Sequence, residues 1–367
     1  MPLSCPKVII VAASLDILGG QGVQACSLVE ALGRDSVPVA FLPINPAFPT
    51  GLRWTRRWRY VRTLVNQAFY IPSLMKVREA DIVHAFSASY AAFLLATVPA
   101  MVMGRLMGRR VILHYHSGEA DDHLAHWGVL VHPWLQLADE IVVPSEYLAR
   151  VFGTHGYATR VIPNVVNLTR FEYRDRIPLR PRLLSTRNLE PYYRIDVIVE
   201  AFRRLQARVP WATLTVAGYG SEESRLKRMA PEGVRFVGRV EPREMPDLYA
   251  SSDVFVNASI VDNQPVSILE ACAAGLPVVS TATGDIGALV RDGQTGLLVP
   301  QNDPAALAAA VLRLIEHPRD ALDMARAARR EVRRFTWSAV RHRWHAAYAG
   351  VEVPPTEKVP AEKWLLH

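Results

Sequence analysis

Short apolar segments alternate with amphipathic, helix-like segments along most of this chain. In the first half, six segments have the length and apolar character of buried strands: Lys7–Ala13, Val37–Leu42, Asp81–His84, Arg110–His114, Asp139–Val143 and Arg160–Ile162. Continuous apolar strands joined by helical connections are typical of a parallel sheet that is covered on both faces. The pattern therefore predicts a doubly wound α/β domain that binds ligands at the carboxyl ends of its strands.

The alternation stops between Pro163 and Pro181, where prolines stand at both ends of a run of alternating charges. It then restarts with six further strand-like segments: 183–186, 213–217, 234–237, 254–256, 277–280 and 296–299. Helices are expected between or after these strands, over 195–208, 222–230, 244–251, 266–274 and 304–316. The second half thus predicts a second doubly wound domain.

A chain of 367 residues is also too long for one ordinary core. We expect a first domain over 1–164, a linker over 165–180 and a second domain over 181–335. A closing helix over about 336–350, which carries Trp337, His342, Trp344 and Tyr348, is expected to pack back on the first domain. A cleft between two such domains excludes water when it closes, which suits transfer chemistry in which hydrolysis must be avoided.

The stretch Asp262–Ser280 contains a turn-like Asp-Asn-Gln, a proline, a helical segment and a strand. Asp262 or Asn263 is expected to cap the helix, whose free N–H groups favour a bound anion. Asp262 and Glu270 lie eight residues apart, a little over two helical turns, so both can face one pocket as acceptors for hydroxyl groups. The alternative interpretation is a capped, buried helix with one surface carboxylate.

The formal net charge is +7, and arginine far outnumbers lysine. A basic balance is compatible with nucleic acid, anionic lipid or a phosphorylated small molecule, but no nucleic-acid motif is present, so we expect no nucleic-acid partner. The cysteines, Cys5, Cys26 and Cys272, have no metal-ligand spacing and are typical of packing residues in a reduced protein. No signal-peptide pattern precedes the first strand, and Tyr90–Met103 is too short to span a membrane. We therefore expect a cytoplasmic protein.

Two glycine-rich turns follow strands. Gly19 and Gly20 open a helix, which allows close approach of an anion or a sugar, but their spacing matches neither a dinucleotide fingerprint nor a P-loop. A simple tight turn is an equally good interpretation. Gly218-Tyr219-Gly220, at the end of a strand in the second half, is a weaker signal of the same kind.

Several motifs together resemble glycosyltransferase family 4. They are Gly19-Gly20, Asp81-Ile82-Val83-His84, Ile162-Pro163-Asn164-Val165-Val166, Asp262 with Glu270 in their Pro-Val-Ser-Ile-Leu-Glu-Ala setting, Ala274-Gly275-Leu276-Pro277-Val278-Val279, and Asp292-Gly293-Gln294-Thr295-Gly296-Leu297-Leu298-Val299. These motifs span nearly the whole chain in the family's order. The resemblance implies the GT-B fold, with two facing Rossmann-like domains and a cleft between them. It also implies transfer of a sugar with retention of configuration, from a nucleotide-sugar that is a substrate, without a cofactor or an obligatory metal.

The resemblance also implies roles for individual residues. Glu270 resembles the acid that holds the ribose hydroxyls, Asp262 takes the place of the acid at the donor sugar, and His116 matches a histidine near the reacting sugar. The remaining residues that the resemblance places at the donor diphosphate or sugar are Gly19, Gly20, Arg187, Val266 and Ser267.

Two positions depart from the family pattern. Asp262 stands where the family usually has glutamate, which is a modest change in reach. Tyr193 stands where the family has a phosphate-binding lysine, and a tyrosine cannot neutralise a leaving diphosphate. Arg194 is the next residue, and we expect it either to supply that charge or to leave the donor contact different.

Other candidates have competing interpretations. His114 and His116 alternate on a strand and would need a third ligand, such as Asp121, Asp122 or His123, to hold a metal, and no defined spacing supplies one. We therefore expect no metal site. His84 is more typical of a buried, hydrogen-bonded histidine, and Glu119 is either a base on the acceptor side or a solvated loop carboxylate.

The segment Arg53–Val65 combines tryptophan with arginine. On a helix, Trp54, Trp58, Val61 and Val65 would fall on one face, a pattern typical of a helix that lies in a membrane interface. The alternative is a helix that packs its tryptophans on the sheet. Our hypothesis is peripheral attachment to an anionic membrane surface, which would give access to a lipid-linked acceptor.

These observations predict a retaining glycosyltransferase that moves a sugar from a nucleotide-sugar donor to a hydroxyl of a glycan or lipid-linked acceptor. One alternative is a GT-B enzyme with a different donor, a sugar epimerase or a phosphorylase. Another is a catalytically silent GT-B domain that binds a glycan or a partner enzyme.

Overall fold

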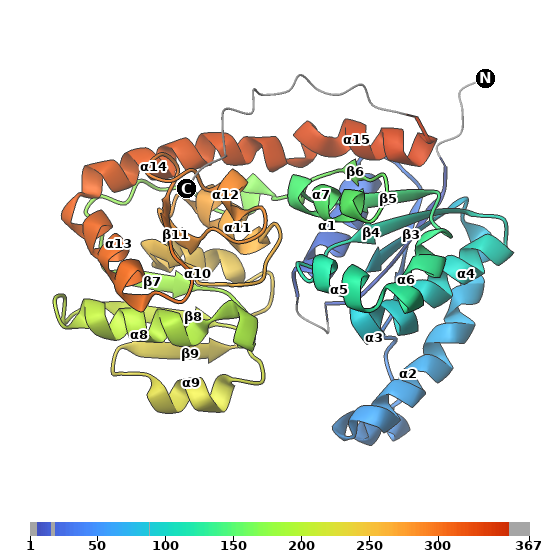
Figure 1. Cartoon of the computed structure of the whole chain (residues 1–367), viewed down its shortest axis with the longest axis horizontal. Helices are drawn as coiled ribbons and strands as arrows, with labels where there is room; N and C mark the ends of the chain where they lie inside the picture. The colour runs from blue at the N-terminus through green and yellow to red at the C-terminus, as the bar shows by residue number, and fades with distance from the viewer. Residues whose placement is uncertain (1–5, 16–18, 88, 352–367) are drawn as a thin grey trace.

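The structure is a computed structural model that describes residues 6–15, 19–87 and 89–351. Cys5 lies outside these residues. Two parallel sheets of six strands each form two lobes that lie side by side (Figure 1). The predicted α/β class with two doubly wound sheets is confirmed.

The first sheet has the strand order β2-β1-β3-β4-β5-β6. Its strands are β1 (Val8–Ala12), β2 (Val39–Pro43), β3 (Ile82–Ser87), β4 (Arg110–Tyr115), β5 (Glu140–Val143) and β6 (Arg160–Val161). Strand β3 extends beyond the predicted end at His84 because Phe86 and Ser87 continue its pairing with β4. The helical segments of this lobe are α1 (Gly20–Arg34), α2 (Arg59–Ser73), α3 (Tyr90–Ala92), α4 (Val98–Leu106), α5 (Ala120–His126), α6 (Gly128–Leu135) and α7 (Glu146–Thr154).

The second sheet has the order β12-β11-β10-β7-β8-β9. Its strands are β7 (Arg182–Ser185), β8 (Thr213–Ala217), β9 (Val234–Gly238), β10 (Val254–Val256), β11 (Val278–Thr281) and β12 (Leu297–Val299). The helices after the linker are α8 (Ile195–Gln206), α9 (Glu223–Met229), α10 (Met245–Ser251), α11 (Val266–Ala274), α12 (Ile286–Leu289), α13 (Pro304–Glu316), α14 (Pro318–Glu331) and α15 (Trp337–Ala349).

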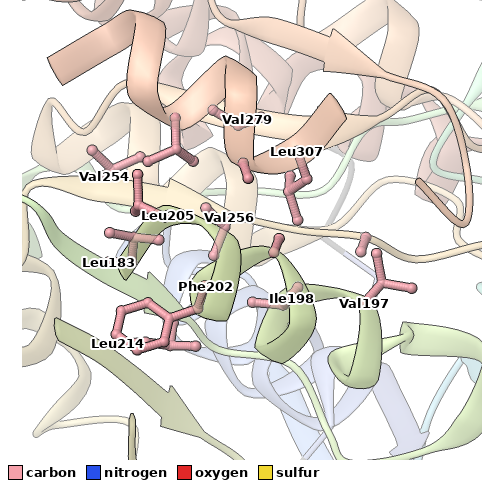
Figure 2. Close-up of a cluster of buried hydrophobic side chains, with 14 of the residues drawn as sticks. Leu183, Val197, Ile198, Phe202, Leu205, Leu214, Val254, Val256, Val279 and Leu307 are labelled. Atoms are coloured by element: carbon pink, nitrogen blue, oxygen red, sulfur yellow. The ribbon is translucent and has the colours of Figure 1, made fainter. Parts of the chain in front are cut away.

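Each sheet carries a hydrophobic core on both faces, as expected of strands that are apolar at successive positions. In the second lobe, Phe202 of α8 and Leu307 of α13 pack against side chains of the strands, including Leu214 and Val256 (Figure 2). The amphipathic face of α8 is therefore held by the sheet. Rigid packing of this kind fixes the loops at the carboxyl ends of the strands.

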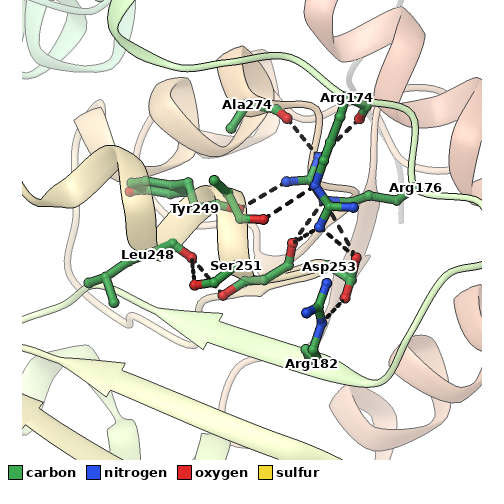
Figure 3. A network of polar contacts seen from close by, with 10 residues as sticks. Arg174, Arg176, Arg182, Leu248, Tyr249, Ser251, Asp253 and Ala274 are labelled. Atoms are coloured by element: carbon green, nitrogen blue, oxygen red, sulfur yellow. Dashed lines mark hydrogen bonds and ion pairs between the residues drawn. The ribbon is translucent and has the colours of Figure 1, made fainter.

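The linker is anchored to the second lobe by a buried arginine (Figure 3). Arg176, with 2% of its surface exposed, donates to three main-chain carbonyls at the ends of α10 and α11, those of Ser252 (2.9 Å), Tyr249 (2.9 Å) and Ala274 (2.6 Å). Helix carboxyl ends attract cations, and here they satisfy a guanidinium that has lost its water. The buried Asp253 also pairs with Arg174 and Arg182. Arg174 and Arg176 of the linker are therefore structural contacts with the second lobe.

Helix α15 returns from the second lobe to the first, where it covers one face of the sheet (Figure 1). Trp344 and Tyr348 are buried against first-sheet residues such as Ile10 and Ile112. Trp337 is partly buried and donates to Asp35 at 3.0 Å, whereas His342 is exposed. The last helix thus adds core to the first sheet.

The segment Arg53–Val65 does not form one helix, so the prediction of a single amphipathic face there is wrong. A 3-10 helix covers Thr50–Arg57, and α2 starts at Arg59 after an extended backbone at Trp58. Trp54 and Trp58 are more than half exposed and contact each other edge to face, whereas Val61 and Val65 are partly buried. Among the described residues, no helix has both the length and the apolar character that crossing a membrane requires.

Candidate active site

Two adjoining cavities lie between the lobes, at the carboxyl ends of both sheets. The donor cavity is our name for the one that Gly19, Gly20, Arg187, Ser267 and Glu270 line together with the loops after β7, β8 and β9. The acceptor cavity is our name for the one that His116, Glu119, Tyr192 and Asp262 line. Gly20, Arg187, Tyr193 and Val266 line both cavities. A molecule that occupies both would therefore pass Arg187.

Gly19 and Gly20, which line the donor cavity, stand where packing does not require glycine. A Cβ built on Gly19 or Gly20 would meet no described atom within 4 Å. Gly20 is the first residue of α1, and no side chain of the described residues caps this helix, so the N–H groups of its first turn are available at the donor cavity. The open space and these donors suit an anionic ligand that approaches the backbone.

Helix α11 begins at Val266, directly at the junction of the two cavities. The expectation that Asp262 or Asn263 caps this helix is wrong: Pro265 is the N-cap and no side chain caps it. Because no side chain in the described part of the chain caps the first turn, the N–H groups around Val266 and Ser267 are open to a ligand. The Asp262 carboxylate instead accepts a hydrogen bond from Arg187.

Glu270 lies one turn further along α11, where it is partly buried and lines the donor cavity. Its Oε2 accepts a hydrogen bond of 2.8 Å from the Tyr249 hydroxyl, which in turn lies 3.0 Å from Thr186 Oγ1. Burial raises the pKa of Glu270 to about 7, although the Tyr249 bond lowers it. A carboxyl group with this pKa is half ionised near neutral pH and can accept hydrogen bonds from ligand hydroxyls.

Arg187 is the central cation of the site, and only 9% of its surface is exposed. It donates to Asp262 Oδ2 at 2.5 Å and to Ser267 Oγ at 3.2 Å. Its Nε atom is buried and has no partner among the described residues. Burial lowers the pKa of Arg187, but Asp262 together with the nearby Tyr193, Tyr249 and Tyr192 outweighs this effect, and the pKa lies above its ordinary value.

Tyr193 covers the other side of Arg187. The guanidinium carbon lies 4.1 Å from the centre of the Tyr193 ring, which is a cation–π contact. Arg194, by contrast, does not reach either cavity. Its backbone is left-handed, and its guanidinium bonds to Asp196 at 3.0 Å and to Asn302. The structure therefore does not place Arg194 where the family lysine would stand.

On the first lobe, three histidines stack toward the acceptor cavity. His84 Nε2 lies 3.2 Å from His114 Nδ1, and the rings of His114 and His116 are 4.1 Å apart. Burial lowers the pKa of His84 and of His116 to about 3 and that of His114 well below its ordinary value, so all three are neutral. His116 Nε2 is buried with no partner among the described residues. Neutral imidazole at this position can offer a hydrogen bond to a ligand.

Glu119 lines the acceptor cavity and is partly buried. Burial, and then the nearby Asp122, raise its pKa. Within the described residues, no three histidine, cysteine, aspartate or glutamate side chains are grouped so that they could hold a metal ion.

Several cavity residues were not predicted from the sequence. Among them are Arg170, Thr186 and Arg239 of the donor cavity and Ser89, Tyr90 and Tyr192 of the acceptor cavity, and Tyr249 lies buried behind Glu270. Tyr90 is distinguished by a positive φ of 56°, but no sequence pattern predicts this backbone conformation. Arg170 precedes the buried Phe171 in the linker. In the sequence it cannot be distinguished from the other charged residues of the linker.

Two family models match the chain. The model of Glycosyltransferase Family 4 matches residues 18–170, and the model of Glycosyl transferases group 1 matches residues 180–317. Each match covers one of the two lobes. Together they include Gly19 and Gly20 from one side of the cavities and Arg187 and Glu270 from the other.

Curated relatives and solved structures agree with these matches. Glycogen synthase of Mycobacterium tuberculosis is 30% identical over 284 residues, which are 71% of this chain and 66% of that enzyme. A GDP-mannose-dependent alpha-(1-6)-phosphatidylinositol monomannoside mannosyltransferase of Mycolicibacterium smegmatis is 30% identical over 270 residues, 64% of this chain and 69% of that enzyme. The chain thus spans about two thirds of the length of these relatives.

Anabaena HepE in complex with UDP-glucose superposes with a TM-score of 0.73 at 17% identity, over 94% of this chain and 100% of that one. Sucrose-phosphate synthase from Thermosynechococcus elongatus gives a TM-score of 0.70 at 19% identity, over 94% and 98% of the two chains. These likenesses show that the fold is GT-B. With both lobes matched by family models and a relative 30% identical over most of its length, the chain belongs to glycosyltransferase family 4.

Proposed function

We propose that this protein transfers a sugar from a nucleotide-activated donor to a hydroxyl group of a glycan or lipid-linked acceptor, with retention of configuration. The observation that carries the proposal is the convergence of Glu270, Arg187 and Asp262 on two adjoining cavities between the lobes. Similarity to a GDP-mannose-dependent mannosyltransferase that acts on a phosphatidylinositol mannoside, and to a protein that binds UDP-glucose, supports this class of donor and acceptor.

In this proposal the donor lies across both cavities. Glu270 accepts hydrogen bonds from the ribose hydroxyls, and the diphosphate lies between Arg187 and the first turns of α1 and α11. The sugar then extends toward Asp262 and His116. Each contact matches the charge of the group that it meets: carboxylates meet hydroxyls, while a guanidinium and helix N-termini meet phosphate.

The transfer step that we propose needs no strong base. The acceptor oxygen attacks the anomeric carbon from the face that the phosphate leaves, the bond from that carbon to the phosphate oxygen breaks, and the leaving phosphate takes the acceptor proton. Glu119 would orient the acceptor hydroxyl, and the neutral His116 would donate or accept a hydrogen bond at the sugar. Exclusion of water by the two lobes favours transfer over hydrolysis.

We also propose that the reaction needs no divalent cation, because Arg187 and two helix N-termini can meet the charge of the leaving diphosphate. Activity should be unchanged when EDTA is added to the protein as purified. Loss of activity in EDTA, with recovery on addition of Mg²⁺ or Mn²⁺, would contradict this part of the proposal.

We propose further that the protein works at the cytoplasmic face of a membrane, attached through Thr50–Arg57 and α2. The apolar side chains exposed there include Trp54, Trp58, Tyr60 and Leu64, and the exposed Arg57 and Arg62 lie among them. Tryptophan and arginine side by side suit the interface of an anionic bilayer.

Co-sedimentation with phosphatidylglycerol vesicles tests this attachment. The double change Trp54→Ala and Trp58→Ala should reduce the bound fraction at least several-fold, while Trp211→Ala, which removes a tryptophan that is 72% exposed on the second lobe, should not. Equal binding of the two variants would exclude this surface.

Calorimetry with UDP, GDP and ADP, followed by a donor–acceptor screen read by mass spectrometry, tests the enzymatic proposal. One of the three nucleotides should bind, and Glu270→Ala should weaken it by about 10- to 100-fold, the value of a hydrogen bond to a charged group. The control Glu316→Ala removes an exposed carboxylate at the end of α13 and should leave binding unchanged. If no nucleotide binds, a silent GT-B domain or a different donor becomes the better interpretation.

A further inference from the structure

The loop that carries Asp262 is held by the lobe opposite to its own. Asp262, Asn263 and Gln264 belong to the second lobe, yet each of them contacts a different segment of the first lobe. We infer that these contacts, the interdomain clamp, position Asp262 for the donor sugar, so that Ser145 and Asn164 are positioning residues for transfer. This inference rests on the proposed function, because it assigns the sugar step to Asp262.

The first contact joins Gln264 to Asn164 at two points. The Asn164 main-chain N–H donates to Gln264 Oε1 at 2.7 Å, and the Asn164 side-chain amide donates to the Gln264 carbonyl at 2.8 Å. Each residue is only 6% exposed. Two bonds that fix both the backbone and the side chain of Gln264 leave it little freedom, and burial makes losing either bond costly.

Asn164 is itself held rigidly. The next residue, Val165, exchanges two hydrogen bonds with the side chain of Gln24 on α1, at 2.8 and 2.7 Å. Helix α1 begins at Gly20 in the donor cavity. The clamp and the helix start that faces the donor therefore belong to one rigid part of the first lobe.

The second contact joins Asn263 to the start of α7. The Ser145 hydroxyl donates to Asn263 Oδ1, and the same hydroxyl accepts from Leu148 N–H at 3.2 Å as the cap of α7. Within the second lobe, the Asn263 carbonyl accepts from Asp285 N–H at 3.0 Å. Asn263 is thus tied to both lobes at once.

The third contact is a close approach of two backbones. A Cβ on Gly118 would lie 2.8 Å from the carbonyl carbon and oxygen of Asp262, which is closer than side chains come in folded proteins. On the other side, a Cβ on Gly284 would lie 2.2 Å from the same carbonyl oxygen. The backbone of Asp262 is therefore held between a glycine of each lobe.

The clamp acts on the sugar end of the site and not on the nucleotide end. The Asp262 carboxylate, which bonds to Arg187 at 2.5 Å and to Ser259 at 3.0 Å, follows directly from the clamped backbone. Glu270, in contrast, is oriented by Tyr249 of its own lobe. Loss of the clamp should therefore slow transfer while the nucleotide still binds.

Gln264→Ala and Ser145→Ala test the inference. The donor is the one that the wild-type protein hydrolyses fastest among UDP-glucose, GDP-mannose and ADP-glucose, so no acceptor is needed. We expect the kcat of donor hydrolysis to fall about ten-fold or more, because a small displacement of a catalytic group lowers the rate by such a factor. The Kd of the matching nucleoside diphosphate should change less than about two-fold, since Glu270 and Arg187 hold it. The control Gln206→Ala removes a glutamine bond of 2.8 Å to Glu232 within the second lobe and should change neither quantity.

Hydrogen–deuterium exchange of the peptide that covers 259–266 gives a second readout that needs no activity. Exchange there should be faster in Gln264→Ala and Ser145→Ala than in the wild-type protein and in Gln206→Ala. Unchanged kcat, unchanged exchange, or an equal loss of nucleotide affinity in the clamp variants would overturn the inference. If the wild-type protein binds no nucleotide, the proposed function fails, and the exchange experiment still decides whether the first lobe holds this loop.

Discussion

At the scale of single residues, the site contains two ionisable side chains, Glu270 and Arg187, whose charged forms are destabilised by burial. Burial raises the pKa of Glu270 to about 7, and the Tyr249 hydroxyl and the nearby Arg170 offset this effect only in part. Arg187 is buried as well, and its ion pair with Asp262 and the tyrosines around it offset the effect of burial on its charge. A ligand that brings hydroxyls to Glu270 and phosphate to Arg187 would satisfy both groups. Perturbed groups of this kind are typical of binding and catalytic sites.

The raised pKa of Glu270 predicts a pH-dependent affinity for the nucleotide. Below about pH 7 the carboxyl group is protonated and loses its charge-assisted bonds to ribose, so binding should weaken as the pH falls through 7. Tyr249→Phe removes the bond that lowers this pKa and should move the midpoint to higher pH. Calorimetry with a nucleotide-sugar measures the midpoint, because its diphosphate diester does not titrate in this range. A midpoint that stays in place in Tyr249→Phe would contradict the assignment.

We predict that a cationic side chain in place of Tyr193 increases the affinity of the site for a nucleoside diphosphate. If the diphosphate lies beside Arg187, Tyr193→Lys adds a positive charge next to it and should tighten nucleoside diphosphate binding by about ten-fold, with a stronger dependence on salt. Tyr193→Phe keeps the ring on the guanidinium and should bind like the wild-type protein. Arg194→Ala is the control, since that guanidinium is held by Asp196 and Asn302. Weaker binding in Tyr193→Lys would mean that the phosphate lies elsewhere.

At the scale of elements, two segments tie the lobes together. The linker is fixed to the second lobe because Arg176 donates hydrogen bonds to the carboxyl ends of α10 and α11. Helix α15 is fixed to the first lobe because Trp344 and Tyr348 pack in its core. Tyr348 also bonds to His84 Nδ1 at 2.9 Å, at the inner end of the histidine stack. Helix α15 therefore supports the row of rings that ends at the acceptor cavity.

Trp344→Ala should cost about 3–5 kcal/mol in the free energy of unfolding of the first lobe, the usual value for an aromatic side chain removed from a core. Only 2% of the Trp344 surface is exposed, and its ring lies 5.0 Å from that of His84. Urea denaturation followed by circular dichroism measures the loss. His342→Ala, on the exposed face of the same helix, should change the free energy by less than about 0.5 kcal/mol. Similar values for the two variants would show that α15 does not support the first lobe.

At the scale of the whole molecule, the sequence predicted the two sheets well, because runs such as Val8–Ala12 are apolar on both faces and have few other ways to fold. Features that depend on distant contacts escaped prediction. Arg176 looked like one of many linker charges until the helix ends that bind it came together, and nothing local marks the break at Trp58. The left-handed backbone at Arg194 turns its side chain away from the cavities, and the interdomain clamp exists only once both lobes are folded.

The two lobes should respond to acid in opposite directions. In the first lobe, the pKa values of His84, His114 and His116 lie below the ordinary 6.5. Below pH 6.5 the unfolded chain therefore binds protons at these histidines, whereas the folded lobe does not. Stability that is present above pH 6.5 is then lost on acidification, at about 1.4 kcal/mol per pH unit for each histidine. In the second lobe, burial raises the pKa of Glu270 to about 7 and of Asp285 to about 6. These carboxyl groups destabilise the folded state when ionised, so that lobe gains stability as the pH falls from 7.

Calorimetric scans between pH 7 and pH 5 should therefore separate into two transitions. The transition of the first lobe should move to lower temperature, while that of the second lobe holds or rises. Trp344→Ala identifies the first-lobe transition, because it should lower that transition alone. His114→Phe removes one buried imidazole from the stack and should make the first transition less sensitive to acid, whereas replacing the exposed His342 should not. A single transition that falls uniformly with pH would mean that the lobes unfold as one unit and that their buried groups do not oppose each other.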